Sequence, residues 1–268
     1  MNTKQNEFSM SEIRSRMLDI LQEVHNCCQQ NGLRYYLAFG TLLGAVRHQG
    51  FIPWDDDIDI FMPRPDYEKF KTCFTHPHYA ILSAETDRNY PLAFPKIHDS
   101  RTIVKEHLGD GDWGIFIDIF IHDGVPSLKK GLQMIKTVKM YRSLAANQRF
   151  TRKFKLRPSL GPRKWIAAFA GKLVHPFISL NTILLSLDKY TQRYRYDDCH
   201  CVVYSWYQPA FIEKDDLEPY CLLPFENHLF RCPAKYKRVL ESYFGPDYMT
   251  PPPPERRVSN HQLRAFLR

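Results

Sequence analysis

The chain lacks an uninterrupted apolar run of about 18 residues, which a membrane-spanning helix would need. It also lacks the basic and then apolar start of a secretory signal peptide. Internal repeats and low-complexity segments are absent from its 268 residues, and 44% of them are hydrophobic. We therefore expect a folded cytoplasmic protein, neither membrane-spanning nor disordered.

The sequence also lacks a pattern of paired cysteines, and it has fewer acidic than basic residues. The seven cysteines are an odd number without framework spacing, which favours reduced thiols, and Cys199-His200-Cys201 is too closely spaced for a usual zinc site. The 29 Asp and Glu are outnumbered by 37 Lys and Arg, giving a formal charge of +8. This excess indicates an anionic partner such as nucleic acid, phospholipid headgroups or a phosphorylated substrate.

Hydrophobic periodicity predicts an α/β (α+β) protein. Residues 9–30 predict a helix capped by Ser11, with its apolar stripe on Ile13, Met17, Leu21 and Val24. Residues 33–46 predict a short strand, a glycine-flanked turn and a short helix. The remaining predicted elements are a strand at 57–62, a helix from 66 to 73, and short strands within 81–87, 92–99, 102–107 and 115–123.

A change in composition divides the chain into three predicted regions, a catalytic core at 1–126, a basic helical insert at 127–196 and a C-terminal region at 197–268 that completes the core. Residues 127–196 hold sixteen Lys or Arg and one acid, Asp188. Within this insert, residues 164–187 are strongly apolar but interrupted. We expect them either to lie along an anionic bilayer surface or to form a cap on the core.

The most informative motif is PWDDDIDIF at residues 53–61. Asp57 and Asp59 are two positions apart in an alternating strand, so their carboxylates should leave the same face of the sheet. Neighbouring carboxylates repel unless a cation lies between them, and Mg²⁺ prefers carboxylates, waters and phosphate oxygens. Asp118, inside the apolar run GIFIDIFIHD, is the predicted third ligand.

Three other interpretations of the acidic motif fit less well. A phosphatase-type DxD would carry its acids at the end of an apolar strand, whereas here the apolar run follows the acids. An exposed acidic run does not explain an aspartate inside an apolar strand. An EF-hand would need glycine where Ile60 stands, which excludes that loop.

Upstream of the acidic motif, Gly40 and Thr41 predict a strand-to-helix turn at which the backbone approaches a phosphate. Arg47 is either a phosphate ligand or a solvated helix-end cation.

These residues resemble the signature of the LicD family of phosphotransferases, within the nucleotidyltransferase superfamily. The resemblance begins at YYLAFGTLLGAVRHQGFIPWDDDIDIFMPRPDYEKF and continues through LAFPKIHDSRT, WGIFIDIFIHDGVP, LPFENHLFRCP and YFGPDYMTPPPPERR. It implies a nucleotidyltransferase-like mixed sheet with flanking helices. Gly40-Thr41, Asp57-Ile58-Asp59 and Asp118 match the superfamily's turn, DxD strand and third acid in order.

The resemblance also implies a reaction. LicD-like proteins transfer the phosphoryl-linked alcohol of a CDP-activated donor to a sugar hydroxyl and release CMP. Mg²⁺ or Mn²⁺ held by Asp57, Asp59 and Asp118 would bridge the pyrophosphate, and Asp118 would orient or deprotonate the acceptor. CDP-choline is the first choice of donor. A cell-surface glycan precursor of the teichoic acid or lipopolysaccharide type, with or without a lipid carrier, is the acceptor.

Further residues are candidates for substrate binding. Lys96 would neutralise the leaving CMP, or else it is a surface lysine. Trp54 and Trp113 flank the acidic strands and could supply aromatic faces to a quaternary ammonium, or simply pack in the core. Four charged residues of the C-terminal region could close the site or bind the acceptor. They are Glu226, Arg256, Arg257 and His261.

Two alternative functions remain open on sequence alone. One is a nucleotidyltransferase acting on RNA or a small molecule. We expect no nucleic acid partner, because the positive charge lies in the helical insert and no basic–aromatic RNA module is present. The other is a non-enzymatic protein with a structural cation site. The favoured location is the cytoplasm, with peripheral contact at the inner membrane face left open.

Overall fold

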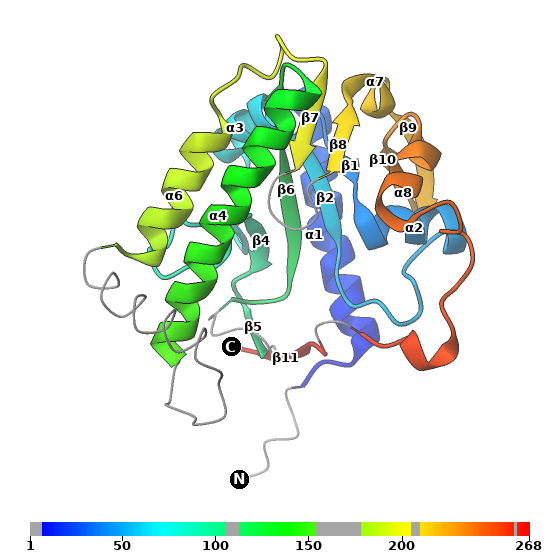
Figure 1. Cartoon of the computed structure of the whole chain (residues 1–268). Coiled ribbons are helices and arrows are strands. Elements are labelled where there is room, and N and C mark those ends of the chain that lie inside the picture. The colour runs from blue at the N-terminus through cyan, green and yellow to red at the C-terminus, as the bar shows by residue number, and fades with distance from the viewer. Residues whose placement is uncertain (1–6, 106–112, 154–177, 205–209, 260–261) are drawn as a thin grey trace.

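The computed structural model describes residues 7–105, 113–153, 178–204, 210–259 and 262–268 (Figure 1). A mixed sheet runs through the centre, with α4 and α6 on one flank and α2 and α8 on the other (Figure 1). This confirms the predicted mixed α/β fold with flanking helices. The helices are α1 Met10–Gln30, α2 Phe39–His48, α3 Arg64–Cys73, α4 Leu128–Lys153, α6 Leu180–Thr191, α7 Lys214–Leu217, α8 Tyr236–Phe244 and the short 3₁₀ helix η1 Pro254–Arg256.

The central sheet is organised around β6, whose ten residues are all buried. On one side β6 pairs in parallel with β2, and on the other it pairs with β4 through residues 116–118 and with β7 through residues 122–125. The strands of this sheet are β1 Tyr36–Leu37, β2 Asp59–Pro63, β3 Tyr79–Leu82, β4 Lys96–Asp99, β6 Phe116–Val125, β7 Cys201–Tyr204 and β8 Ala210–Glu213.

Two small antiparallel sheets attach the C-terminal residues to the rest of the chain. One pairs β9 Cys221–Phe225 with β10 His228–Cys232, and β10 contacts β1. The other pairs β11 Arg264–Leu267 with β5 Thr102–Lys105. The chain therefore returns to its N-terminal half at its very end (Figure 1).

The first helix agrees with its predicted stripe but not with its predicted cap. Ile13, Met17, Leu21 and Val24 are all buried on α1. The cap is Ser9 and not Ser11, so that prediction was wrong. Ser9 accepts from the backbone N–H of Glu12, whose side chain accepts from the backbone N–H of Ser9, forming a capping box that satisfies two donors at the helix start.

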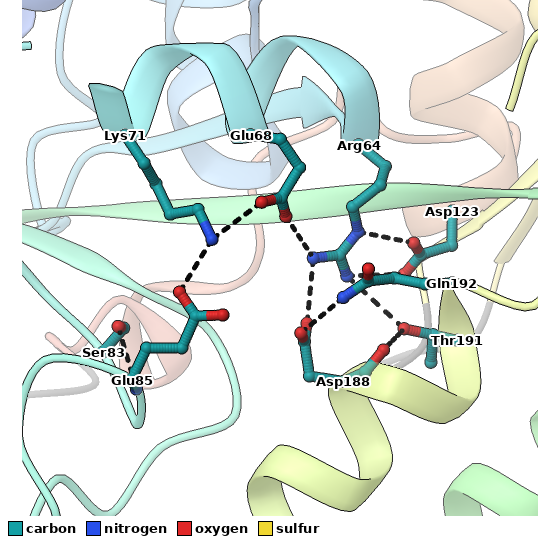
Figure 2. Close-up of polar contacts among 9 residues, drawn as sticks. All are labelled: Arg64, Glu68, Lys71, Ser83, Glu85, Asp123, Asp188, Thr191 and Gln192. Atoms are coloured by element: carbon teal, nitrogen blue, oxygen red, sulfur yellow. Dashed lines mark hydrogen bonds and ion pairs between the residues drawn. The ribbon is translucent and has the colours of Figure 1, made fainter. Parts of the chain in front are cut away.

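Arg64 joins the helical segment that follows β6 to the sheet (Figure 2). Its guanidinium donates to Asp123 on β6 at 2.7 Å and contacts Asp188 on α6 at 2.9 Å, and it reaches Glu68 at 3.3 Å. The Arg64 side chain is only 11% exposed. Asp188, the one acidic residue of 127–196, therefore pairs α6 with α3, and Arg64 extends the connection to β6 through Asp123.

The apolar side of α6 packs inward. Leu180, Ile183, Leu184 and Leu187 are buried, so this part of the predicted bilayer-surface stretch at 164–187 packs against the protein, as the cap interpretation requires. Residues 164–177 lie outside the described residues. Across the described residues, no helix combines the length and apolar character needed to cross a membrane.

Candidate active site

Three charged residues form one row across three neighbouring strands. Asp59 on β2 lies opposite Asp118 on β6, and Lys96 on β4 lies opposite Asp118 from the other side. Residues directly opposite each other in a sheet point to the same face, so the three side chains share one face. Lys96 Nζ donates to Asp118 Oδ1 at 2.6 Å. Few charged side chains are buried this deeply, with 8%, 4% and 2% exposure for Asp59, Asp118 and Lys96.

Lys96 is held inside an aromatic environment. Its Nζ lies 3.3 Å from the centroid of the Phe116 ring, 5.5 Å from Phe94 and 5.8 Å from Trp113. Aromatic faces attract a cation, and burial strengthens that attraction. The alternative of a surface lysine is therefore wrong. Trp113 is itself 3% exposed, so its place is in the packed wall around Lys96.

The glycine turn is tied directly to the acidic strand. Helix α2 begins at Phe39, and Thr41 Oγ1 accepts a hydrogen bond from the backbone N–H of Asp59 at 2.9 Å. Ala38 precedes the helix without a side-chain cap, so no side chain of residue 38 covers the amides of the first turn. Phe39 has a φ of 39°, a left-handed conformation that is costly for a residue with a side chain.

Asp55 is a further candidate site residue, which the sequence interpretation overlooked. Its Oδ2 lies against the α-carbon of Gly40, at 2.5 Å from the point where a Cβ would stand. Burial, followed by the charge of Asp57, raises the pKa of Asp55 to about 8. The signal was present in the sequence as the first of three consecutive aspartates, but the chain alone did not show which of them turns toward the glycine.

The cluster concentrates negative charge in a buried place. Burial comes first among the causes that raise the pKa of Asp59 well above its usual value, followed by the charges of Asp57, Asp118 and Asp55. Lys96 acts in the opposite direction and lowers the pKa of Asp59. Carboxyl groups in this situation either keep protons or require a compensating cation.

A magnesium ion at this cluster would have to bring other ligands with it. Among the described residues, no group of three or more His, Cys, Asp or Glu side chains could hold a metal ion by itself. Mg²⁺ in phosphoryl-transfer sites takes one or two carboxylates and fills its other positions with water and substrate phosphates. Asp57, Asp59 and Asp118 therefore stay predicted ligands, and one Asp118 oxygen is already shared with Lys96.

Arg47 and Trp54 lie together beside the C-terminal residues. Arg47 donates to the backbone carbonyl of Tyr248 at 3.0 Å. Its guanidinium carbon is 6.0 Å from the centroid of the Trp54 ring, and that of Arg257 is 5.2 Å from it. Trp54 thus already contacts two cations of the protein. These contacts do not test either residue as a substrate ligand, and both stay candidates.

Other acidic residues near the motif hold loops in place. Asp56 is 1% exposed and accepts from the Ser259 hydroxyl and the Leu263 N–H, which attaches the C-terminal residues to the acidic loop. Glu226 accepts from the N–H of Phe51 at 3.0 Å. Arg256 is exposed, and His261 lies outside the described residues.

Gly40 offers a specific test of this geometry. We expect Gly40→Ala to lower turnover by about 10- to 100-fold, because the added methyl group must push the Asp55 carboxyl away and disturb the acidic cluster. Alanine favours helix more than glycine does, so the melting temperature should not fall. Steady-state kinetics and thermal unfolding check both halves. Full activity in this variant would contradict a role for the contact.

Comparison with known proteins identifies the family to which this mixed α/β fold and its charged row belong. Residues 32–120 match the family described as LicD/FKTN/FKRP, nucleotidyltransferase domain. The match ends at Phe120, so it includes Gly40, Thr41, the acidic motif, Lys96 and Asp118. The chain belongs to the LicD family.

Among characterised relatives is the lipopolysaccharide cholinephosphotransferase LicD of Haemophilus influenzae. It is 31% identical over 267 residues, which covers 93% of this chain and 95% of the relative. The human ribitol 5-phosphate transferase FKRP is 59% identical over 29 residues, which is 11% of this chain and 6% of the relative. An uncharacterised Rickettsia typhi protein is 40% identical over 65 residues, covering 24% of this chain and 21% of that protein.

Proposed function

We propose that the protein transfers a phospho-alcohol, phosphocholine in the first instance, from a CDP-activated donor to a sugar hydroxyl of a cell-surface glycan precursor. The observation that carries this proposal is the buried row of Asp59, Asp118 and Lys96 behind the Gly40-Thr41 turn. Its support from outside the structure is the likeness to a cholinephosphotransferase along nearly the whole chain.

The proposed chemistry is a substitution at phosphorus. The acceptor oxygen forms a bond to the phosphorus that carries the alcohol, and the bond from that phosphorus to the bridging oxygen breaks, so that CMP leaves with this oxygen. The acceptor hydroxyl loses its proton. Asp118 is the candidate to orient that hydroxyl or take its proton, because its carboxyl lies in the middle of the row, between Asp59 and Lys96.

The row and the residues beside it have separate proposed tasks. Asp57, Asp59 and Asp118 would hold Mg²⁺ or Mn²⁺, which when bound supplies positive charge to the pyrophosphate. The first turn of α2, at Gly40 and Thr41, has no side-chain cap, so its backbone N–H groups would be the donors to a phosphate of the donor substrate. Lys96 balances the acidic cluster and is the nearest described ammonium to Asp118, from which it can neutralise charge on the leaving CMP.

Choline is proposed ahead of ribitol on the extent of similarity. The cholinephosphotransferase matches 93% of the chain, whereas the ribitol 5-phosphate transferase matches 11%. A direct assay decides between them. Purified protein is given Mg²⁺, CDP-choline or CDP-ribitol, and a glycan acceptor, and the products are separated. Release of CMP with the choline donor is expected. Release of pyrophosphate from a nucleoside triphosphate instead would make the protein a nucleotide-adding enzyme and overturn the proposal.

Binding of the donor predicts a change in thermal stability. With Mg²⁺ and CMP or CDP-choline at a hundredfold excess over the dissociation constant, unfolding should cost about 2.7 kcal/mol more. This corresponds to a rise in melting temperature of about 5 °C for a chain of this size. ATP at the same concentration should give a smaller rise. Equal shifts from ATP and the cytidine ligands would contradict the choice of a CDP donor.

A further inference from the structure

Helix α4 is apolar on two opposite sides, and the described residues of the protein cover only one of them. On the inner side Met134, Ile135 and Val138 are buried against β6 and β7. The outer side carries four large apolar side chains that remain open to solvent. They are Leu128, Leu132, Met140 and Leu144, which are 56%, 50%, 54% and 43% exposed.

These four side chains follow one another in a strip along the helix. Their spacing is four residues, with Lys136 at the one remaining position of the series, so neighbours in the strip are one turn apart. Lys129 and Lys139 are also exposed and lie on the same side at helical spacing. We call Leu128, Leu132, Met140 and Leu144 with these three lysines the outer face of α4. Figure 1 shows α4 at the front, with its length unobstructed by the other described elements.

The charge of α4 has a single sign. Its 26 residues include eight Lys or Arg and no Asp or Glu. Interspersed lysines can extend their ammonium groups past an apolar surface while their methylene stems stay on it. An apolar strip with lysines and without acids matches a surface that offers negative charge at one level and hydrocarbon just beneath it.

We propose that the outer face of α4 docks the protein on a lipid bilayer that contains anionic headgroups. Exposed apolar side chains grouped along one helix, with polar residues around them, mark an interaction surface. A second copy of the same face would set lysines against lysines, so like charges oppose self-association. An anionic bilayer offers negative headgroups to the lysines and hydrocarbon to the apolar strip. The helix lies parallel to the membrane, with the lysines at the level of the headgroups and the four apolar side chains beneath them, at the boundary with the acyl chains.

Vesicle sedimentation tests this surface on the full chain. Wild-type protein should sediment with vesicles of phosphatidylglycerol and phosphatidylcholine, much less with phosphatidylcholine alone, and less as salt is raised. The variant L128Q/L132Q/M140Q/L144Q should lose at least tenfold in vesicle affinity. The matched control is L222Q/L229Q, whose two leucines are 48% and 57% exposed on the β9–β10 hairpin. It should bind as wild type does.

The lysines allow a second comparison. Charge reversal in K129E/K136E/K139E should abolish sedimentation with anionic vesicles. The same change at exposed lysines elsewhere, K69E/K105E/K237E, alters net charge equally and should weaken it far less. Equal loss in both triple variants would assign binding to net charge and overturn a defined face.

Two further outcomes would overturn the proposal. One is an apolar variant that binds vesicles as wild type does. The other is a dimer of the wild-type protein in light scattering together with a monomer of the same apolar variant. That result would make the outer face a contact between copies. The docking face does not depend on the proposed reaction, because turnover of a short soluble acceptor should be unchanged in all four variants. If the wild-type protein does not turn over that acceptor, the result counts against the proposed reaction and not against docking.

Discussion

Replacing Asp59 with Asn is expected to reduce turnover by at least about 100-fold while leaving the fold intact. Asp59 stands in the buried row and carries a pKa raised by burial and by its acidic neighbours. Asparagine has nearly the same shape but cannot carry the negative charge that a divalent cation requires. The measurement is the rate of CMP release with Mg²⁺, and addition of EDTA should abolish the wild-type rate. Asp19→Asn, at an exposed carboxyl on α1, is the control and should keep full activity.

The same substitution should not destabilise the protein in the absence of metal. A carboxyl whose pKa is raised by folding costs stability as the pH rises above its unfolded value of about 3.9, and the full cost persists above the folded pKa. At pH 7 the neutral amide of the Asp59→Asn variant escapes that cost, so the melting temperature in EDTA should stay the same or rise. Retention of more than about a tenth of the wild-type rate would contradict the metal assignment.

Asp118→Asn is expected to behave differently, with loss of activity and loss of stability together. Lys96 donates to Asp118 from a position 2% exposed, so removal of the carboxylate leaves a buried ammonium without its partner. Breaking a buried ion pair on one side costs about 3–5 kcal/mol. We expect the lower end of this range, because Asp59 remains close enough to share the charge of Lys96.

Urea unfolding in EDTA measures this cost. The double variant Lys96→Met/Asp118→Asn is the matched control, because it removes both charges and should recover most of the lost stability. If Asp118→Asn alone unfolds at the wild-type urea concentration, the ion pair does not contribute as the structure indicates.

Periodicity in the sequence predicted those elements whose burial has a regular pattern. The apolar stripe of α1, the strand at β2 and the long apolar run of β6 each carry such a pattern over enough residues to be read from the chain. The cap was placed wrongly at Ser11 although the spacing of Ser9 and Glu12 is that of a capping box. The three-region division of the chain stays a prediction.

The pairing of strands could not be predicted to the residue. An acid within an apolar run singled out Asp118, but the register that places it between Asp59 and Lys96 depends on contacts among segments 22 to 59 residues apart. The position of Lys96 was therefore left open between site and surface. Asp55 escaped notice because a loop, unlike a strand, gives no period from which a side-chain direction follows.

Because β4 and β7 pair with different parts of the same edge of β6, the chain cannot be cut between them without exposing that edge. The strand meets β4 near its start and β7, which follows more than 70 residues later, near its end. A fragment that stops after residue 126 would leave residues 122–125 with unpaired backbone groups on an apolar strand. Such an edge is a template for intermolecular strand pairing. We therefore expect the smallest stably folded unit to be discontinuous in sequence, and a shortened form should precipitate unless the β7–β8 hairpin is retained.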